Sequence, residues 1–390
     1  MNQESYIFGA PATVLYGAGC VEKVGTQMKK YNVKRALIVT DDIQVSGGKV
    51  GKLKAILAAS QIDSCVYSGV NTEPTNIHVE EGVNEYKKNS CDSVIALGGG
   101  SPIDTAKAIA ILATNPGKIT DYEGRNIKIP NQRAVLVAIG TTAGTGSEVT
   151  RAAVIADKSR NVKMVIKDEM VRPDIAVCDS LLTVSMPPSV TAATGMDALA
   201  HAIEGSVSKE TQPLSEIFGL AAIKLISKSL PRAWADGQDL EARSDMMFAQ
   251  LLAGFAFGIS ATCSGHGLAR PFGGHFHVAH GLCNAFFLPE FMEFTLPACP
   301  GKFAKVAEAM GENITGMTDV DAAKKAVEAV KRLRKKINIP TLKEYGIDMQ
   351  EYRRLIPQMV KDGIASGSHR LNPRMPTELE LTKIYESLAQ

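Results

Sequence analysis

Histidine is concentrated in one stretch of this 390-residue chain, residues 266–280, with the sequence HGLARPFGGHFHVAH. The stretch holds four of the chain's seven histidines, His266, His275, His277 and His280. A neutral imidazole is the commonest metal ligand among side chains. Glycine and proline interrupt the stretch and apolar runs flank it, a setting in which solvated charges are not expected. The stretch is therefore a candidate for half of a metal site.

A second cluster lies some 65 residues upstream, in GMDALAHAIE at residues 195–204. Asp197 and His201 are four residues apart, and on a helix that spacing places both side chains on one face. Such a pair is more often a surface hydrogen bond than a pair of ligands. Combined with two histidines from the later stretch, however, it forms a divalent site with an open position. Zn²⁺ and Fe²⁺ both suit a carboxylate-plus-imidazole ligand set.

Two glycine-rich loops follow strand-like apolar runs. Residues 97–104, LGGGSPID, end one such run and open a helix; glycines let a phosphate approach the backbone, and the helix start supplies free N–H donors. Pro102 suits the first helical turn, where a missing N–H costs nothing. The alternative is a plain strand-to-helix turn. The second loop, GTTAGTGSE at residues 140–148, has hydroxyls that could hydrogen-bond a ribose or a nicotinamide amide.

Asp41 stands just after the apolar run at residues 35–40. A carboxylate there commonly accepts from the ribose 2′-hydroxyl of NAD and repels the 2′-phosphate of NADP. Alternatively, Asp41 simply caps a helix or a turn. Residues 17–19, Gly-Ala-Gly, look like the start of a Rossmann fingerprint, but Glu22 replaces its third glycine and would repel a pyrophosphate. We therefore prefer residues 98–101 as the phosphate loop.

Composition narrows the class of protein. The chain is 45% hydrophobic and 22% charged, and its length suggests two domains. A net charge of +2 gives no reason to expect a nucleic-acid or anionic-membrane partner. The seven cysteines are scattered without a CxxC pair, so neither a disulfide framework nor a thiolate zinc site is indicated. No signal peptide and no bilayer-length apolar run is apparent, and we expect a cytoplasmic protein.

Hydrophobic periodicity divides the chain in two. The first half alternates strand-like and helix-like segments, which predicts a parallel sheet with helices on both faces that binds ligands beyond the carboxyl ends of its strands. After Pro187-Pro188 the patterns are helical. We predict an α/β domain at residues 1–185 and an all-α domain at residues 186–390. The expected strands are 35–40, 64–67, 93–97 and 134–139; the expected helices are 50–59, 79–88, 102–113, 190–207, 214–229, 240–257, 304–309, 321–336 and 377–388.

Four motifs together resemble the iron-containing (group III) alcohol dehydrogenase family: GGGSPIDTAKAIA, TTAGTGSEVT, TGMDALAHAIEG and HGLARPFGGHFHVAHG. The resemblance covers nearly the whole chain, from Tyr16 to Arg374. It implies an N-terminal dinucleotide-binding α/β domain and a C-terminal helical domain, with metal and cofactor in the cleft between them. It also implies an NAD(H)-linked alcohol dehydrogenase or aldehyde reductase, and a homo-oligomer, dimeric or larger.

The resemblance assigns residues by motif. Asp197, His201, His266 and His280 match the ligands of one divalent metal, Fe²⁺ or Zn²⁺, whereas His275 and His277 do not match ligands. When bound, the metal acts as a Lewis acid on the substrate oxygen while the nicotinamide exchanges hydride with the substrate carbon. The positions expected to contact NAD(H) are Asp41, Gly98, Gly99, Gly100, Ser101, Asp104, Thr141, Thr142, Thr145 and Lys163.

One position departs from the family. Relatives commonly carry a histidine four residues after the third ligand, where this chain has Arg270. Arginine does not lose its proton in proteins, so it is a poor proton shuttle, and beside a dication it favours an anion. A carboxylate such as Glu204 could pair with it. Otherwise the substrate brings the anion: a short aldehyde with a sulfonate, phosphonate or carboxylate head, such as sulfoacetaldehyde, held by Arg270 and His277.

Three alternatives remain at this point. The first is a reductase of neutral short alcohols or diols. The second is a lyase of the dehydroquinate synthase type, which uses NAD only transiently and would show no net change in NADH. The third is a noncatalytic role, which the retention of all four ligand positions and of the glycine loop disfavours.

Overall fold

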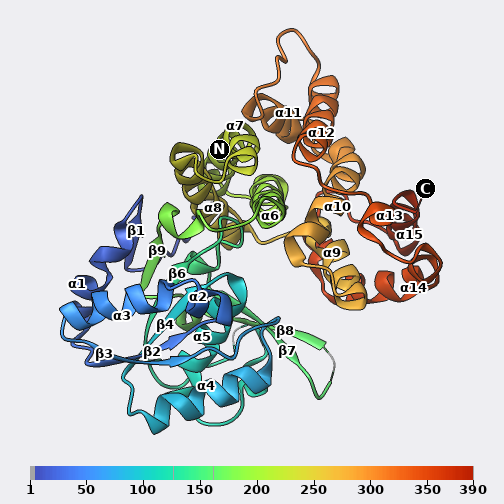
Figure 1. Ribbon diagram of the computed structural model, residues 1–390. Helices are drawn as coiled ribbons and strands as arrows, with labels where there is room; N and C mark the ends of the chain where they lie inside the picture. Colours follow the sequence, from blue (N-terminus) through green and yellow to red (C-terminus); the bar gives the residue numbers. More distant parts are fainter. Residues whose placement is uncertain (1–4, 126, 161, 390) are drawn as a thin grey trace. The chain divides into compact units, whose positions relative to one another are not determined.

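The chain forms two compact units in the computed structural model, which describes residues 5–125, 127–160 and 162–389 (Figure 1). One unit is Phe8–Val184 and contains the strands together with five α-helices. The other comprises residues 185–389 with residues 5–7, and its described part is helical. The predicted fold class, a parallel α/β unit followed by a helical one, is confirmed.

A six-stranded parallel sheet forms the centre of the α/β unit, in the order β1-β9-β6-β4-β2-β3. The prediction missed its β1–β9 edge because these strands are only four residues long and lie outside any extended apolar run. The strands of this sheet are β1 (Thr13–Tyr16), β2 (Arg35–Val39), β3 (Asp63–Tyr67), β4 (Ser93–Gly98), β6 (Val135–Gly140) and β9 (Ile175–Cys178).

Helices cover both faces of this sheet, as the continuous apolar strands require. In β4, Val94 and Ala96 face a core shared with α4 and α5, whereas Ile95 and Leu97 face a core shared with α1 and α3. Burying each large aliphatic side chain stabilises the fold by roughly 1.5–3 kcal/mol. The α-helices of this unit are α1 (Val24–Met28), α2 (Asp42–Ser46), α3 (Lys49–Ala59), α4 (Asn76–Lys88) and α5 (Gly100–Leu112).

The carboxyl ends of β2, β4 and β6 lie side by side, because these strands are hydrogen-bonded neighbours. Gly98 at the end of β4 is in register with Gly140 at the end of β6, and the N–H of Thr141 donates to the Gly98 carbonyl at 2.9 Å. From β2 the chain proceeds to β3 on one side, and from β4 to β6 on the other. Such a reversal of strand order is where open α/β sheets bind their ligands.

A small second sheet was not predicted. It contains β5 (Gly124–Arg125), β8 (Val162–Lys167) and β7 (Ala152–Asp157), with β7 and β8 antiparallel. Ala153 and Ile155 of β7 extend the core that α4 and α5 form on the main sheet.

The second unit is built from α6 to α15. Its α6 packs against α7, α8 and α10, and α9 packs against α10 and α14. The helices are α6 (Pro188–Val207), α7 (Pro213–Ala235), α8 (Leu240–Ser260), α9 (Ser264–Phe276), α10 (His280–Thr295), α11 (Pro300–Ala309), α12 (Asp319–Lys336), α13 (Leu342–Tyr345), α14 (Met349–Ala365) and α15 (Glu378–Ser387).

No single helix in the described part of the chain is long and apolar enough to cross a membrane. Only α8 and α9 taken together, bent by 104° at their junction, reach that length and hydropathy.

Candidate metal and cofactor sites

The first glycine loop connects β4 to α5 and is packed too closely for larger residues. A Cβ atom on Gly98 would lie 2.6 Å from Pro102 Cγ, and one on Gly100 would lie 3.2 Å from Thr145 Cγ2. Helix α5 begins at Gly100 and has no side-chain cap from Gly99. Its first N–H groups are therefore available to an anion, as in helix-terminal phosphate sites.

Asp41 lies at the same edge of the sheet as this loop. Its Oδ2 would be 3.3 Å from a Cβ on Gly98, so the carboxylate and the glycine turn are close neighbours. Asp41 also caps α2, because its Oδ1 accepts from the backbone N–H of Gln44 at 3.0 Å and from the Gln44 amide at 3.2 Å. Both interpretations of this residue are thus compatible: Oδ1 caps the helix, and Oδ2 is directed at the predicted phosphate loop.

The second glycine loop contributes a buried hydroxyl to the same region. Thr142 lies beside Gly99, with its Cγ2 3.5 Å from where a Cβ would be, and its Oγ1 is buried without a hydrogen-bond partner among the described residues. Thr141 is buried beside it. A buried hydroxyl of this kind is costly unless a ligand satisfies it. The glycine turn, the uncapped helix start and the free hydroxyl all fit a dinucleotide.

Two other residues predicted to contact the cofactor make protein contacts. Asp104 accepts from Ser147 Oγ at 2.6 Å and from the Val154 N–H at 2.9 Å, so it connects α5 to the second loop and to β7. Lys163 lies on β8 and pairs with Glu73 at 2.7 Å. Neither side chain forms a hydrogen bond or ion pair with the phosphate loop in the described part of the chain.

The Gly17–Gly19 turn is occupied by protein contacts. The backbone N–H groups of Gly19 and Val21 both donate to the buried Asp179, at 2.9 and 3.0 Å. These donors are the ones that a pyrophosphate at this turn would require. The contacts agree with the preference for the Gly98 loop.

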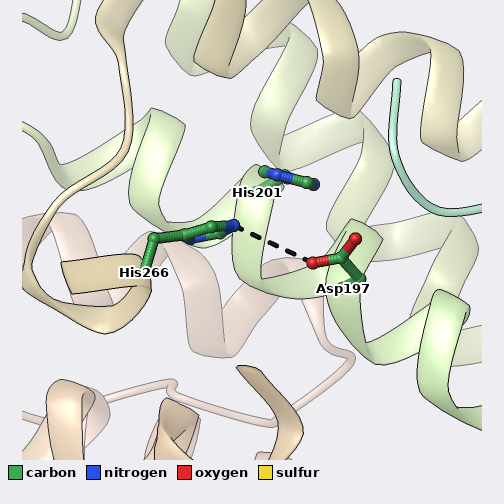
Figure 2. A group of neighbouring side chains, drawn as sticks. All are labelled: Asp197, His201 and His266. Atoms are coloured by element: carbon green, nitrogen blue, oxygen red, sulfur yellow. Dashed lines mark ion pairs between the residues drawn. The ribbon is translucent and has the colours of Figure 1, made fainter. Parts of the chain in front are cut away.

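Three predicted metal ligands converge within the helical unit (Figure 2). Asp197 and His201 lie one turn apart on α6, and His266 lies in the first turn of α9. Their candidate ligand atoms all lie within 4.8 Å of one another, and the Oδ1 of Asp197 is 3.8 Å from Nε2 of His266. All three side chains are buried. Burial lowers the pKa of His266 well below its usual value, so its imidazole is neutral, the form that binds metals.

His280, the fourth predicted ligand, is the first residue of α10. Its Nε2 also lies 3.8 Å from Asp197 Oδ1, but 47% of its side chain is exposed. The next residue explains the close approach of the two helices: a Cβ on Gly281 would lie 2.5 Å from the carbonyl oxygen of Ala193 on α6. The absence of a side chain at Gly281 thus brings His280 to the ligand group.

Glu204 orients His266 from the same helix that carries two of the ligands. It is fully buried, and its Oε1 lies 2.5 Å from His266 Nδ1 and accepts from the His266 backbone N–H at 3.2 Å. Its other oxygen accepts from the backbone N–H of Cys263. Burial raises the pKa of the Glu204 carboxyl to about 7. A proton on Nδ1 directs the lone pair of Nε2 toward Asp197, the carboxylate–histidine pattern of metal sites.

His201 is held by stacking. Its ring lies on Phe257 of α8, with centroids 4.0 Å apart and planes 16° apart, and it also stacks on His266 at 4.5 Å. Nδ1 of His201 is buried without a hydrogen-bond partner among the described residues. Three imidazoles and one carboxylate are the donor types that a borderline divalent ion prefers. The residues fit the metal that the family resemblance implies.

Sequence reasoning missed Asn284, which lies one turn after His280 on α10. Its side-chain nitrogen is 2.6 Å from Asp197 Oδ1, 3.0 Å from His266 Nε2 and 3.2 Å from His280 Nε2. The four-residue spacing from a predicted ligand is the signal that could have identified it, since that spacing places both side chains on one helix face.

Arg270 lies one turn after His266 on α9 and has no hydrogen bond or ion pair with any described residue. The alternative from the sequence was that a carboxylate such as Glu204 pairs with Arg270, but Glu204 contacts His266 instead. Burial lowers the pKa of Arg270, and Glu204 and Asp197 oppose this, so the guanidinium lies near the ligand group. It is only partly exposed. An unpaired, partly buried guanidinium is costly unless an anion joins it.

The two remaining histidines of the stretch have exposed side chains. His275 is exposed and pairs with Asp362 of α14 at 3.0 Å. His277 ends α9 in a left-handed conformation with φ of 53°, and its side chain is exposed.

Comparison with known proteins identifies the family of this chain. Residues 11–180 match the model of iron-containing alcohol dehydrogenase, and residues 191–389 match that of the C-terminal domain of the same family. The chain is 39% identical to an NAD-dependent methanol dehydrogenase from Bacillus methanolicus over 97% of this chain and 98% of the relative.

Solved structures give the same result. A 1,3-propanediol oxidoreductase has a TM-score of 0.95 and 36% identity, over 99% of this chain and 100% of that chain. Sulfoacetaldehyde reductase from Bifidobacterium kashiwanohense, solved in complex with NAD⁺, has a TM-score of 0.89 and 30% identity, over 99% of each chain. The protein is thus an NAD-dependent oxidoreductase acting on CH–OH groups. It belongs to the iron-containing alcohol dehydrogenase family.

Proposed function

We propose that this protein is an NADH-dependent reductase of short aldehydes that carry an anionic head group. The observation that carries the proposal is Arg270, whose guanidinium lies one helical turn from His266 and has no hydrogen bond or ion pair among the described residues. The overall reaction is aldehyde + NADH + H⁺ → alcohol + NAD⁺. Arg270 holds the sulfonate, phosphonate or carboxylate, and the exposed His277 at the end of α9 is the second contact to the head group.

We propose Asp197, His201, His266 and His280 as the ligands of one divalent ion, Fe²⁺, in keeping with the family's description. Bound there, the ion supplies Lewis-acid polarisation of the substrate oxygen. Two other residues orient the proposed ligands: Glu204 fixes the tautomer of His266, and Phe257 fixes the ring orientation of His201.

We propose NAD(H) binding by the α/β domain, residues 1–185, and metal binding by the helical domain, residues 186–390. The Gly98–Ser101 turn would hold the pyrophosphate, and Thr141, Thr142 and Thr145 would contact the rest of the cofactor. Asp104 would act by fixing the second loop through Ser147. We also propose a homo-oligomer, dimeric or larger, as the working form.

A neutral substrate is the second candidate, because the relatives include a methanol dehydrogenase and a 1,3-propanediol oxidoreductase. The test is a panel of sulfoacetaldehyde, succinic semialdehyde and propanal, assayed with NADH after the bound metal has been measured. We expect kcat/KM to be about tenfold or more higher for the anionic aldehydes, because a charge-assisted contact contributes roughly 1.5–3 kcal/mol. A preference for propanal contradicts the anion proposal, and turnover without net NADH consumption contradicts the reductase.

The Asp41→Gly variant tests the cofactor assignment. Asp41 Oδ2 is directed at the glycine turn, so its charge should disfavour a 2′-phosphate. The wild-type protein should have a higher kcat/KM with NADH than with NADPH. The variant should lower the ratio of these two values about tenfold, because losing one charged contact changes the free energy by roughly 1.5 kcal/mol, and about 1.4 kcal/mol corresponds to a factor of ten. Asp42→Ala removes the neighbouring exposed carboxylate and should leave the ratio unchanged. Equal efficiency of the wild-type protein with both cofactors contradicts the assignment.

A further inference from the structure

The side-chain amide of Asn284 contacts three of the proposed metal ligands at once. Its Nδ2 lies within 3.2 Å of acceptor atoms on Asp197, His266 and His280, which come from α6, α9 and α10. Asn284 itself is buried on α10, one turn from His280. It therefore connects the three helices that supply the ligands.

The number of lone pairs decides which of these contacts can exist beside a metal ion. An imidazole nitrogen has a single lone pair, so His266 or His280 cannot bind an ion through Nε2 and accept from Asn284 together. A carboxylate has about four acceptor sites and can do both. The contact to Asp197 is also the shortest of the three, at 2.6 Å. Asn284 is thus placed to donate to Asp197 while Asp197 binds the ion.

The other end of the amide argues against a purely structural role. Asn284 Oδ1 is buried and has no hydrogen-bond partner among the described residues. Its neighbours along α10 are the buried apolar side chains of Cys283 and Ala285. A buried, unsatisfied carbonyl oxygen destabilises a fold, so an apolar residue of similar size would serve packing better.

We propose that Asn284 is a positioning residue of the metal centre. By donating to Asp197 Oδ1 it fixes the rotamer of that carboxylate, which then meets His201, His266 and His280 at one ion. The inference rests on the proposed metal ligands. Polar groups that support ligands in this way commonly change metal affinity by about 10–100-fold when removed.

The experiment measures metal binding directly. The full-length protein, stripped of metal, is titrated with Co²⁺ in competition with a chromophoric chelator, and the Co²⁺ absorption spectrum reports the coordination geometry. Asn284→Ala should raise the dissociation constant for Co²⁺ about 10–100-fold and change the spectrum. Asn284→Leu keeps the volume without the amide and should weaken Co²⁺ binding at least as much as Asn284→Ala. It provides the measurement if the alanine variant does not fold.

A control variant separates packing from positioning. Leu282→Ala removes a partly buried side chain from the same helix, and it should lower the Tm without changing the dissociation constant for Co²⁺. Wild-type Co²⁺ affinity and spectrum in both Asn284 variants would overturn the inference, whatever their Tm. If the wild-type protein itself binds no Co²⁺, the proposed ligand set is wrong, and the inference fails with it. This outcome is distinguished from a failure of the Asn284 role alone, because it is measured on the wild-type protein.

Discussion

Replacing His266 with alanine is expected to abolish turnover and to reduce bound metal to a small fraction of one ion per chain. His266 is buried, and its neutral imidazole faces Asp197 while Glu204 holds its other nitrogen. A bound metal lowers the activation barrier by several kcal/mol through Lewis-acid polarisation of the substrate oxygen. Its loss should therefore lower kcat/KM by about a thousandfold or more. The measurements are steady-state kinetics with NADH and metal content by mass spectrometry.

His275→Ala is the matched control for this variant. His275 lies on the same helix but is exposed and pairs with Asp362, so its loss should leave metal content and turnover near wild type. The affinity for NAD⁺ should be unchanged in both variants, because the glycine loops belong to the α/β unit. Full activity of His266→Ala, or of metal-stripped wild-type protein with chelator present, would contradict the proposed site.

Arg270→Ala should alter the choice of substrate more than the chemistry. A bidentate, charge-assisted contact contributes roughly 1.5–3 kcal/mol, so kcat/KM for sulfoacetaldehyde or succinic semialdehyde should fall about 10–100-fold. Propanal has no anion for the guanidinium to hold, and its kcat/KM should change much less. The ratio of the two values, measured side by side, is the diagnostic quantity.

A second arginine, exposed on another helix, controls for the change in net charge. Arg354 on α14 is exposed and pairs with Glu351, so Arg354→Ala should leave the substrate ratio unchanged. Arg270→Lys retains the charge without the bidentate fork and should retain part of the selectivity. If anionic and neutral aldehydes lose activity equally in Arg270→Ala, Arg270 does not bind the head group.

Elements with long or repeated patterns could be predicted from the sequence. Residues 93–97 and 134–139 are continuous apolar runs, and the structure has them as the buried strands β4 and β6. Other elements were missed for two reasons: β9 is a four-residue strand outside any extended apolar run, and the 17-residue α14 has Pro357 in its interior, a residue that normally interrupts a helix. The helix predicted at residues 304–309 begins four residues earlier in the structure, where α11 is Pro300–Ala309. Its first residue is a proline, which favours the first position of a helix.

The candidate site shows a similar division. Spacing along α6 was enough to place Asp197 and His201 on one face, but spacing alone could not separate His280 from His275 and His277. The difference arises from how α9 ends and how Gly281 packs on α6, which are properties of the tertiary structure. In the same way, the partner of Glu204 depended on where α9 begins, and only the structure assigns it to His266 rather than to Arg270.

Glu204 links the start of α9 to the proposed metal site, because one carboxylate on α6 contacts both. The N–H groups of Cys263 and His266 have no partner within α9, because they lie at its start, and both donate to Glu204. The same carboxylate also contacts the imidazole of His266. A carboxylate at a helix N-terminus also stabilises the helix dipole. Before the first turn of α9 docks on α6, Glu204 does not cap the helix. It also does not yet fix the tautomer of His266. If the proposed ligands bind the ion, we expect metal loading to follow docking of α9, and the rate of metal uptake during refolding then tests that order.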